Sequence, residues 1–271
     1  MYAQVIVPLD GSEFASRALT PAARIAAASD SPLLVVSYAP SRLELPDLQK
    51  TVEAQVEKAG CTDATVKVST SGRPGFAIAE EVEKSPGSLI CMSSLGRSRT
   101  GAMLGSVAES VLRQVTIPLV LVGPRAEVER FTLDGPIVVC VDGSPTSEAI
   151  LPIVTSWAIV YGLDVRVVTV LPPATRAGGG STVLVDSGYV HRVAQQLQRE
   201  IGRAVDFDVL HGDTVVDRLV DDARQAHASV LAASTHGRTG LRRVAAGSVT
   251  AALVRDASQP VLAYRPLQLL T

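Results

Sequence analysis

The strongest constraint on this chain is that much of its sequence occurs twice. The stretch VIVPLDGSEFASRAL at residues 5–19 reappears as IVVCVDGSPTSEAIL at residues 137–151. A repeat of this length predicts one fold made twice, and 271 residues suffice for two domains of ordinary size. We therefore expect one domain at residues 1–124 and another at residues 135–271, joined by the linker GPRAEVERFTLDG.

Within each copy, short apolar runs alternate with segments of helical periodicity. Strands that are apolar on nearly every residue and are separated by helices predict a parallel sheet covered on both faces. Each copy is therefore expected to be a doubly wound α/β domain. In the first copy we expect strands at 4–9, 32–39, 64–70, 88–94 and 118–123, with helices at 14–29, 48–60, 76–85 and 105–115. In the second we expect strands at 136–141, 164–171, 205–212, 229–235 and 260–266.

The two copies differ in length. Asp10 and Asp142 are 132 positions apart, whereas Gly105 and Gly247 are 142 apart, so the second copy has gained about ten residues between these landmarks. The stretch RAGGGSTVLVDSG at 176–188 is the expected place. Its three successive glycines favour a mobile loop over a phosphate-binding turn, because no strand leads into them and no helix is expected to follow directly.

Composition excludes several functional classes. A net charge of −2 and an aromatic content of 4% argue against a nucleic-acid partner, which would require a basic face and stacking side chains. The three cysteines have no CxxC spacing and predict neither a disulfide framework nor a zinc site, and Cys91 and Cys140 are expected in the core. No apolar run of membrane-spanning length is present. We therefore expect a soluble, cytoplasmic protein with small-molecule or protein partners and no membrane association.

The loop STHGRTGLRRVAAGSVT at 234–250, which repeats SLGRSRTGAMLGSVAES of the first copy, has features of an anion site. Gly247 and Ser248 open a helix whose first N–H groups would suit a polyphosphate; alternatively, Ser248 only caps the helix. Asp10 and Asp142 end the first strand of each copy, where doubly wound sheets bind ligands. Alternatively, the D-G-S segments only form turns, for which these residue types are well suited.

Together, the S-x-x-G-x9-G-S spacing of this loop and the VDGS after the strand resemble the universal stress proteins, in particular the tandem two-domain type frequent in actinobacteria. The resemblance covers about residues 3–124 and 135–266. It implies a five-stranded parallel sheet per domain in the order 3-2-1-4-5, with ATP, with or without Mg²⁺, as the ligand. It also implies that the last strands of two domains pair, either within one chain as a pseudo-dimer or between chains as a homodimer.

The resemblance further implies which residues bind the nucleotide. Asp142 would contact the adenine and ribose side, the backbone at Val170 would meet the adenine, and the glycine loop would wrap the ribose and phosphates. In the second half the implied residues are Asp142, Val170, Ser234, Gly237, Arg238, Gly247, Ser248 and Val249. In the first half they are Asp10, Tyr38, Ser93, Gly96, Gly105, Ser106 and Val107.

Two departures from the motif bear on the ligand. Its first glycine is replaced by Ser93 in one half and Ser234 in the other, and the first loop encloses eight residues where the second encloses nine. Because phosphate binding depends on the path of the loop backbone, the second half matches the nucleotide-binding motif better than the first. Arg238 in this loop either contacts a phosphate or is solvated.

Three functional classes stay open: a nucleotide-responsive stress or signalling regulator, a slow ATP hydrolase, and a nucleotide-free protein-interaction module. The chain has no G-x4-G-K-[ST] motif and no carboxylate cluster near Ser248. The sequence therefore favours the regulator over an enzyme.

Overall fold

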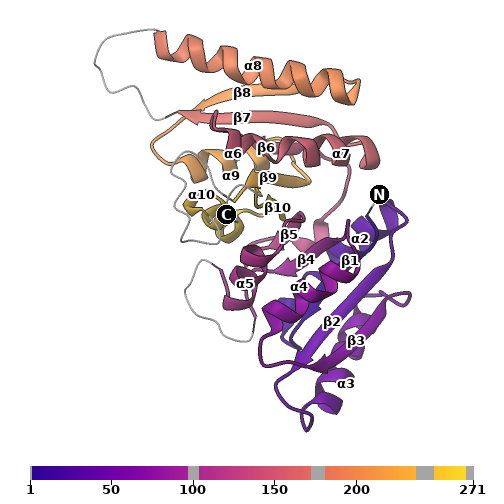
Figure 1. Cartoon of the computed structure of the whole chain (residues 1–271). Coiled ribbons are helices and arrows are strands. Elements are labelled where there is room, and N and C mark those ends of the chain that lie inside the picture. Colours follow the sequence, from indigo (N-terminus) through magenta and orange to yellow (C-terminus); the bar gives the residue numbers. More distant parts are fainter. Residues whose placement is uncertain (1, 97–103, 172–180, 236–246, 267–271) are drawn as a thin grey trace.

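The computed structural model describes residues 2–96, 104–171, 181–235 and 247–266, with the backbone alone for residues 181–186. Each half alternates strands with helices (Figure 1), and the structure confirms every predicted strand to within two residues at either end. The first half contains β1 (Val5–Leu9), α1 (Glu13–Ser16), α2 (Leu19–Ala28), β2 (Leu33–Ala39), α3 (Leu45–Lys58), β3 (Thr65–Thr70), α4 (Pro74–Lys84), β4 (Leu89–Ser93), α5 (Ser106–Gln114) and β5 (Leu119–Val122).

A 3₁₀ turn, η1 (Val128–Arg130), lies in the linker between the halves. The second half then repeats the same alternation of elements. It contains β6 (Ile137–Cys140), α6 (Pro145–Glu148), α7 (Leu151–Tyr161), β7 (Val165–Leu171), α8 (Ser181–Ile201), β8 (Asp206–His211), α9 (Val215–Gln225), β9 (Val230–Ser234), α10 (Ser248–Asp256) and β10 (Val261–Tyr264).

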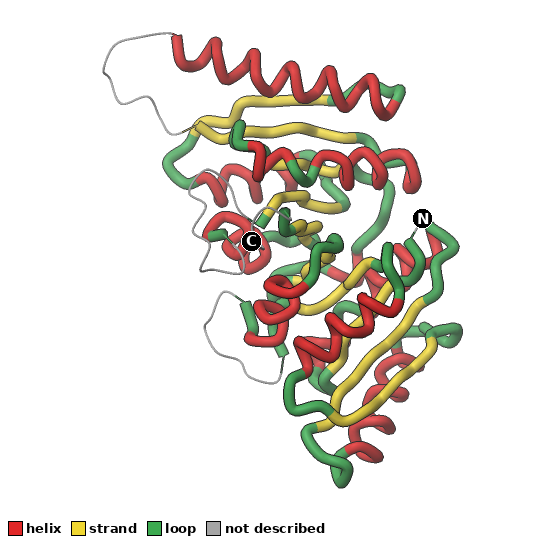
Figure 2. The backbone as a smooth tube through the Cα atoms, viewed as in Figure 1, coloured by secondary structure: helices red, strands yellow, loops and turns green. Residues whose placement is uncertain are grey.

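The strands form one continuous ten-stranded sheet in the order β3-β2-β1-β4-β5-β10-β9-β6-β7-β8. Each half has the order 3-2-1-4-5 with parallel neighbours, as expected. The halves meet where β5 and β10 pair antiparallel, with Val120 opposite Leu262. In Figure 2 the strands, in yellow, form a layer with helices, in red, on both of its sides. The last strands thus pair within the chain, so the pseudo-dimer is the arrangement that this fold adopts.

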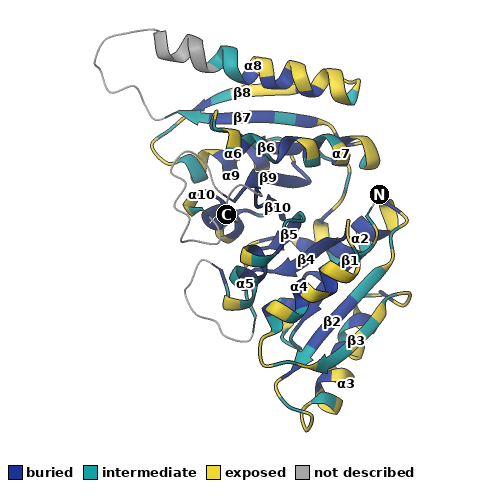
Figure 3. Cartoon of the chain, viewed as in Figure 1, coloured by how far each residue is buried: buried dark blue, intermediate teal, exposed yellow. Residues whose placement is uncertain are grey.

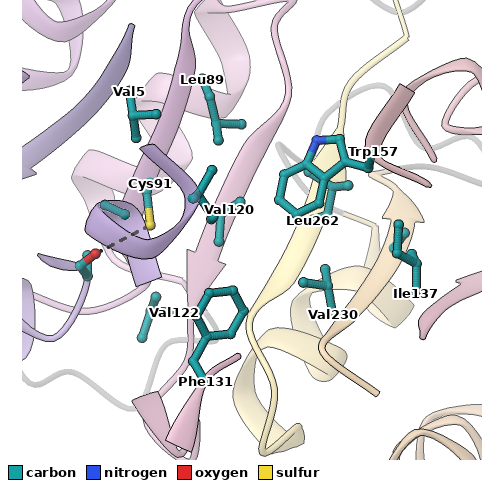
Figure 4. Packing of buried hydrophobic residues seen from close by; sticks show 14 of the residues in the cluster. Val5, Leu89, Cys91, Val120, Val122, Phe131, Ile137, Trp157, Val230 and Leu262 are labelled. Atoms are coloured by element: carbon teal, nitrogen blue, oxygen red, sulfur yellow. Dashed lines mark hydrogen bonds between the residues drawn. The ribbon is translucent and has the colours of Figure 1, made fainter. Parts of the chain in front are cut away.

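Both faces of the central strands are buried, whereas the edge strands β3 and β8 are partly exposed (Figure 3). Each face has one apolar cluster that spans the two halves. Side chains of α2, α3, α7 and α8 cover one face, and those of α4, α5, α9 and α10 cover the other. Figure 4 shows Val120 of β5 and Leu262 of β10 in one cluster, with Trp157 of α7 beside Leu262 and Phe131 of the linker beside Val122. Since such contacts remove apolar surface of both halves from water, the two repeats share one core.

The predicted helix at 14–29 is two helices. Ser12 caps α1 by accepting a hydrogen bond from the Ala15 N–H (3.2 Å), and a turn then separates α1 from α2. The turn places Arg17 against the linker, where its guanidinium donates to the carbonyl oxygens of Gly123 (3.2 Å) and Pro124 (3.1 Å). The interruption thereby attaches the linker to the first half.

The expectation that the glycines at 178–180 form a mobile loop with no helix directly after them was wrong in its second part. The glycines lie outside the described residues, but α8 begins directly after them, at Ser181. Further along α8, apolar side chains three and four positions apart pack into the core, namely Val190, Val193, Ala194 and Leu197. This tertiary packing outweighs the poor helix propensity of the residues at the start of the segment. Neither α8 nor another helix in the described ranges has the length and apolarity that a membrane span requires.

Candidate functional site

Each half has a cavity at the carboxyl ends of its strands, in equivalent positions. The first cavity has a volume of about 250 Å³ and lies between the ends of β1, β2 and β4 and the starts of α4 and α5. The second has a volume of about 270 Å³ and lies between the ends of β6, β7 and β9 and the starts of α9 and α10. Both occupy the place where doubly wound sheets bind ligands.

The structure brings together the residues that the sequence singled out. The first cavity is lined by Asp10, Tyr38, Ser93, Gly96, Gly105, Ser106 and Val107. The second is lined by Asp142, Val170, Ser234, Gly247, Ser248 and Val249. Gly237 and Arg238 lie outside the described residues. That these residues contact a ligand stays a prediction.

The aspartates at the strand ends are held by tight turns. The Oδ1 atom of Asp10 accepts a hydrogen bond from the backbone N–H of Ser12 (2.9 Å), and Asp142 Oδ1 accepts from the N–H (3.0 Å) and hydroxyl (2.6 Å) of Ser144. The intervening Gly11 and Gly143 have φ values of 82° and 81°, a conformation that favours glycine. The D-G-S segments therefore are turns, as the alternative interpretation held, and these turns fix carboxylates that line the cavities.

Two covering helices brace these turns through residues that the sequence analysis missed. The Gln55 side-chain amide, from α3, donates to the carbonyl oxygens of Gly11 (3.0 Å) and Ser12 (3.1 Å). The Tyr189 hydroxyl, from α8, donates to the Glu148 carboxylate (2.8 Å) in the helix that follows the second turn. Neither contact has a local sequence signal, because each joins segments more than forty residues apart.

Glycines also bring the backbone close to the first aspartate and to the strand ends. A Cβ on Gly96 would lie 2.5 Å from Oδ2 of Asp10, so only glycine permits this approach. The Gly105 N–H donates to the Ser94 carbonyl (2.7 Å), and the Gly247 N–H makes the equivalent bond to Thr235. These bonds fix the start of α5 and α10 against the ends of β4 and β9.

The nine-residue helices α5 and α10 begin at the cavities with glycine as N-cap. Glycine has no side chain to cap them, and no side chain among the described residues does so, which makes the first N–H groups at the positive end of each helix dipole available to a ligand or to water. Ser94 and Ser234 also line the cavities, with exposures of 1% and 7%. Their hydroxyl oxygens are buried and have no hydrogen-bond partner among the described residues. Leaving a buried hydroxyl unpaired is costly, so these hydroxyls point to a ligand or water.

Ser94 was missed by the sequence analysis, which selected its neighbour Ser93. The Ser93 hydroxyl accepts a hydrogen bond from the Leu95 N–H (3.4 Å), whereas the Ser94 hydroxyl has no partner among the described residues. Ser94 and Thr235 are equivalent positions of the two copies, since each directly follows the fourth strand of its half. This repeated hydroxyl residue is the signal that could have found Ser94.

The cavities differ in their aromatic and polar lining. Tyr38 in the first is replaced by Val170 in the second, and its hydroxyl donates to the Ala77 carbonyl (3.1 Å). Burial, with nearby glutamates, raises the pKa of Tyr38 to about 12. Ala108 in the first is replaced by Thr250, whose hydroxyl donates to the Ser234 carbonyl (2.7 Å).

Cys140 lines the second cavity, whereas Cys91 is fully buried in the core. The expectation that both are core residues is therefore confirmed only for Cys91. Burial, together with the charge of Asp222, raises the pKa of the Cys140 thiol to about 12, so the thiol is neutral near pH 7. No group of three metal-binding side chains suited to an ion occurs in the part of the chain that the structure describes.

Comparison with known proteins gives the same family for both halves. The model of the universal stress protein family matches residues 1–123 and again residues 135–265. The chain is 29% identical over 195 residues to a universal stress protein of Mycolicibacterium smegmatis, a match that covers 65% of this chain and 59% of that protein. It is 28% identical over 189 residues to one of Mycobacterium tuberculosis, with 64% and 61% covered. The chain thus matches about three fifths of the length of these relatives.

Solved structures share the arrangement of both halves. A functionally unknown protein of Pseudomonas aeruginosa has a TM-score of 0.67 at 18% identity, covering 99% of this chain and 94% of that one. A universal stress protein of Archaeoglobus fulgidus has a TM-score of 0.65 at 16% identity, covering 98% and 99%. At these identities the likeness shows the fold.

Proposed function

The chain belongs to the universal stress protein family, and we propose that it binds an adenine nucleotide, ATP with or without Mg²⁺, in the cavity of each half. In this proposal the nucleotide is a regulatory ligand that changes the conformation or the association of the protein. The carrying observation is that each cavity joins an uncapped helix start with a buried, unpartnered serine hydroxyl.

The chemistry of each cavity fits the parts of a nucleotide. The first N–H groups of α5 and α10, with the hydroxyls of Ser106 and Ser248, suit phosphate oxygens. The carboxylates of Asp10 and Asp142 suit ribose hydroxyls, which donate hydrogen bonds. The apolar lining between them suits a base, because purines bind through their faces as well as their edges. This lining includes Leu9, Ile78 and Met92 in the first half and Val141, Leu219 and Ala233 in the second.

The proposal includes a nucleotide site in the first half, although its glycine loop is one residue shorter than that of the second half. Its cavity has nearly the volume of the second, about 250 Å³ against about 270 Å³, and it has the equivalent helix start and strand ends. We therefore propose two sites per chain rather than one.

A regulator is favoured over a hydrolase by the ionisable groups present. Among the described lining residues these are Asp10 and Tyr38 in one cavity and Asp142 and Cys140 in the other. The aspartates hold turns, and the pKa values of Tyr38 and Cys140 are raised to about 12, far from the value that suits a general base near pH 7. Slow hydrolysis and a nucleotide-free interaction module are the alternatives.

The proposal also covers the compartment and the partners of the protein. We propose a cytoplasmic protein whose partners are adenine nucleotide and protein rather than nucleic acid, because its net charge is −2. Since β5 and β10 each have a neighbouring strand on both sides, a homodimer would form through another surface.

The test is to release and count bound nucleotide. Denatured, freshly purified protein should release adenine nucleotide, separated by anion exchange, and nucleotide-free protein should bind two ATP per chain in calorimetry. Asp10→Ala and Asp142→Ala should each abolish the site of their own half and retain the other. Absence of both released nucleotide and heat on ATP titration would overturn the proposal. ATP turnover above that of a Gly247→Val variant would favour the hydrolase.

A further inference from the structure

Contacts at the junction of the two halves connect the elements that line the two cavities. There β5 pairs with β10, and the three paired positions are Leu119 with Ala263, Val120 with Leu262 and Leu121 with Val261. All six residues have no exposed surface. Since these strands are packed on both faces, a displacement of one is resisted by the other half.

One residue past each strand touches the helix that begins at the opposite cavity. Gly123 follows β5, and a Cβ there would overlap the carbonyl oxygen of Val254 in α10. Arg265 follows β10, and its Nη1 donates to the carbonyl oxygen of Leu112 in α5 (3.2 Å). Leu112 and Val254 are equivalent, each six positions after the serine that starts its helix (106 to 112 and 248 to 254).

The same strand ends are bonded to the cavities on their own side. In the first half the Gly105 N–H donates to Ser94, and the Ser94 N–H donates to the carbonyl of Val122 (2.9 Å), which directly precedes Gly123. In the second half the Gly247 N–H donates to Thr235. The Thr235 N–H in turn donates to the carbonyl of Tyr264 (2.8 Å), which directly precedes Arg265.

These contacts close into a ring. Starting at the first cavity, the ring runs through the end of β5 to α10, along α10 to the second cavity, and through the end of β10 to α5, which returns to the first cavity. The two crossings differ in kind, because one is a close backbone contact and the other is a buried arginine. Arg265 is only 6% exposed, and its positive charge lies at the C-terminal end of α5, which favours a cation.

We propose that Arg265 is a positioning residue for the first cavity, supplied by the second half, and that it couples the two nucleotide sites. This inference rests on the proposed function. A ligand at the start of α10 fixes that helix and the strand ends bonded to it, and Arg265 then holds α5 in its binding position. The second ligand consequently has less to order and binds more tightly.

The test compares single sites with the intact protein. ATP titrations of Asp142→Ala and Asp10→Ala give the affinity of each site when the other cannot fill. In the unsubstituted protein we expect the second ATP to bind about five-fold or more tightly than these single-site values imply, the lower end of typical coupling. An isotherm equal to the sum of the two single-site isotherms overturns the coupling while leaving the proposed function intact. No heat in any of the three proteins overturns both.

The role of Arg265 is tested separately. Arg265→Met, which keeps the length but not the charge, should reduce the coupling to within two-fold of none, and Arg265→Lys should restore part of it. Arg24→Met is the matched control, because Arg24 also donates to a carbonyl across the chain, at Glu129 in the linker, but outside the ring. Unchanged coupling in Arg265→Met overturns the assignment. If Arg265→Met does not fold, coupling in Arg265→Lys equal to that of the unsubstituted protein overturns the assignment instead.

Discussion

At Gly96 the backbone lies directly against the Asp10 carboxylate, leaving no room for a Cβ. In Gly96→Ala we expect the flexible end of Asp10 to be displaced while the fold persists, because the close atom is a side-chain oxygen. ATP affinity of the first site should fall about ten-fold, or about 1.4 kcal/mol. Calorimetry on the Asp142→Ala background checks this, and Gly72→Ala, where a Cβ meets nothing within 4 Å, should change nothing. Equal affinities for both variants would contradict the expectation.

At the scale of elements, the inserted segment could be a helix or a loop, and in the structure the residues after its glycines form α8. Gly188 lies inside α8 without positive φ, and a Cβ there would touch only the end of Arg192, at 3.8 Å. Gly188→Ala should therefore stabilise the protein by about 0.5–1 kcal/mol, since alanine is the better helix former. Gly162, which ends α7 at φ 69°, is the opposite control, and Gly162→Ala should destabilise by about 1 kcal/mol. Urea unfolding measures both, and destabilisation by Gly188→Ala would mean that the helix is absent.

At the scale of the molecule, the shared core predicts that the halves unfold together. Each apolar cluster contains residues of both halves, including Val120 and Leu262 in one and Leu121 and Val261 in the other. We expect a single urea transition in which the fluorescence of Trp157 and the circular dichroism of the whole chain coincide. Leu262→Ala should shift that one transition by about 2–5 kcal/mol. Two separate transitions would contradict a shared core, and Leu43→Ala, at a position 91% exposed, should leave the curve unchanged.

The candidate site was largely predictable because its signals are local. The repeated D-G-S and G-S segments mark chain reversals and helix starts, and the fold class places both at the carboxyl ends of strands. Residues that reach the site from elsewhere had no such signal. Gln55 and Tyr189 support the turns from covering helices, and Ser94 differs from Ser93 in that its hydroxyl has no hydrogen-bond partner among the described residues.

The sequence by itself determined that this chain is two copies of one doubly wound α/β domain, since apolar periodicity and turn residues act over a few positions. Only the tertiary structure decided how the copies are joined. β5 and β10 are both uniformly apolar, and nothing in such strands distinguishes a partner in the same chain from one in another. The choice depends on the linker, on the packing of Trp157 and Phe131 beside the paired strands, and on the contacts of Gly123 and Arg265. The contacts of Gly123 with Val254 and of Arg265 with Leu112 join residues more than a hundred positions apart, and such distances leave no local pattern.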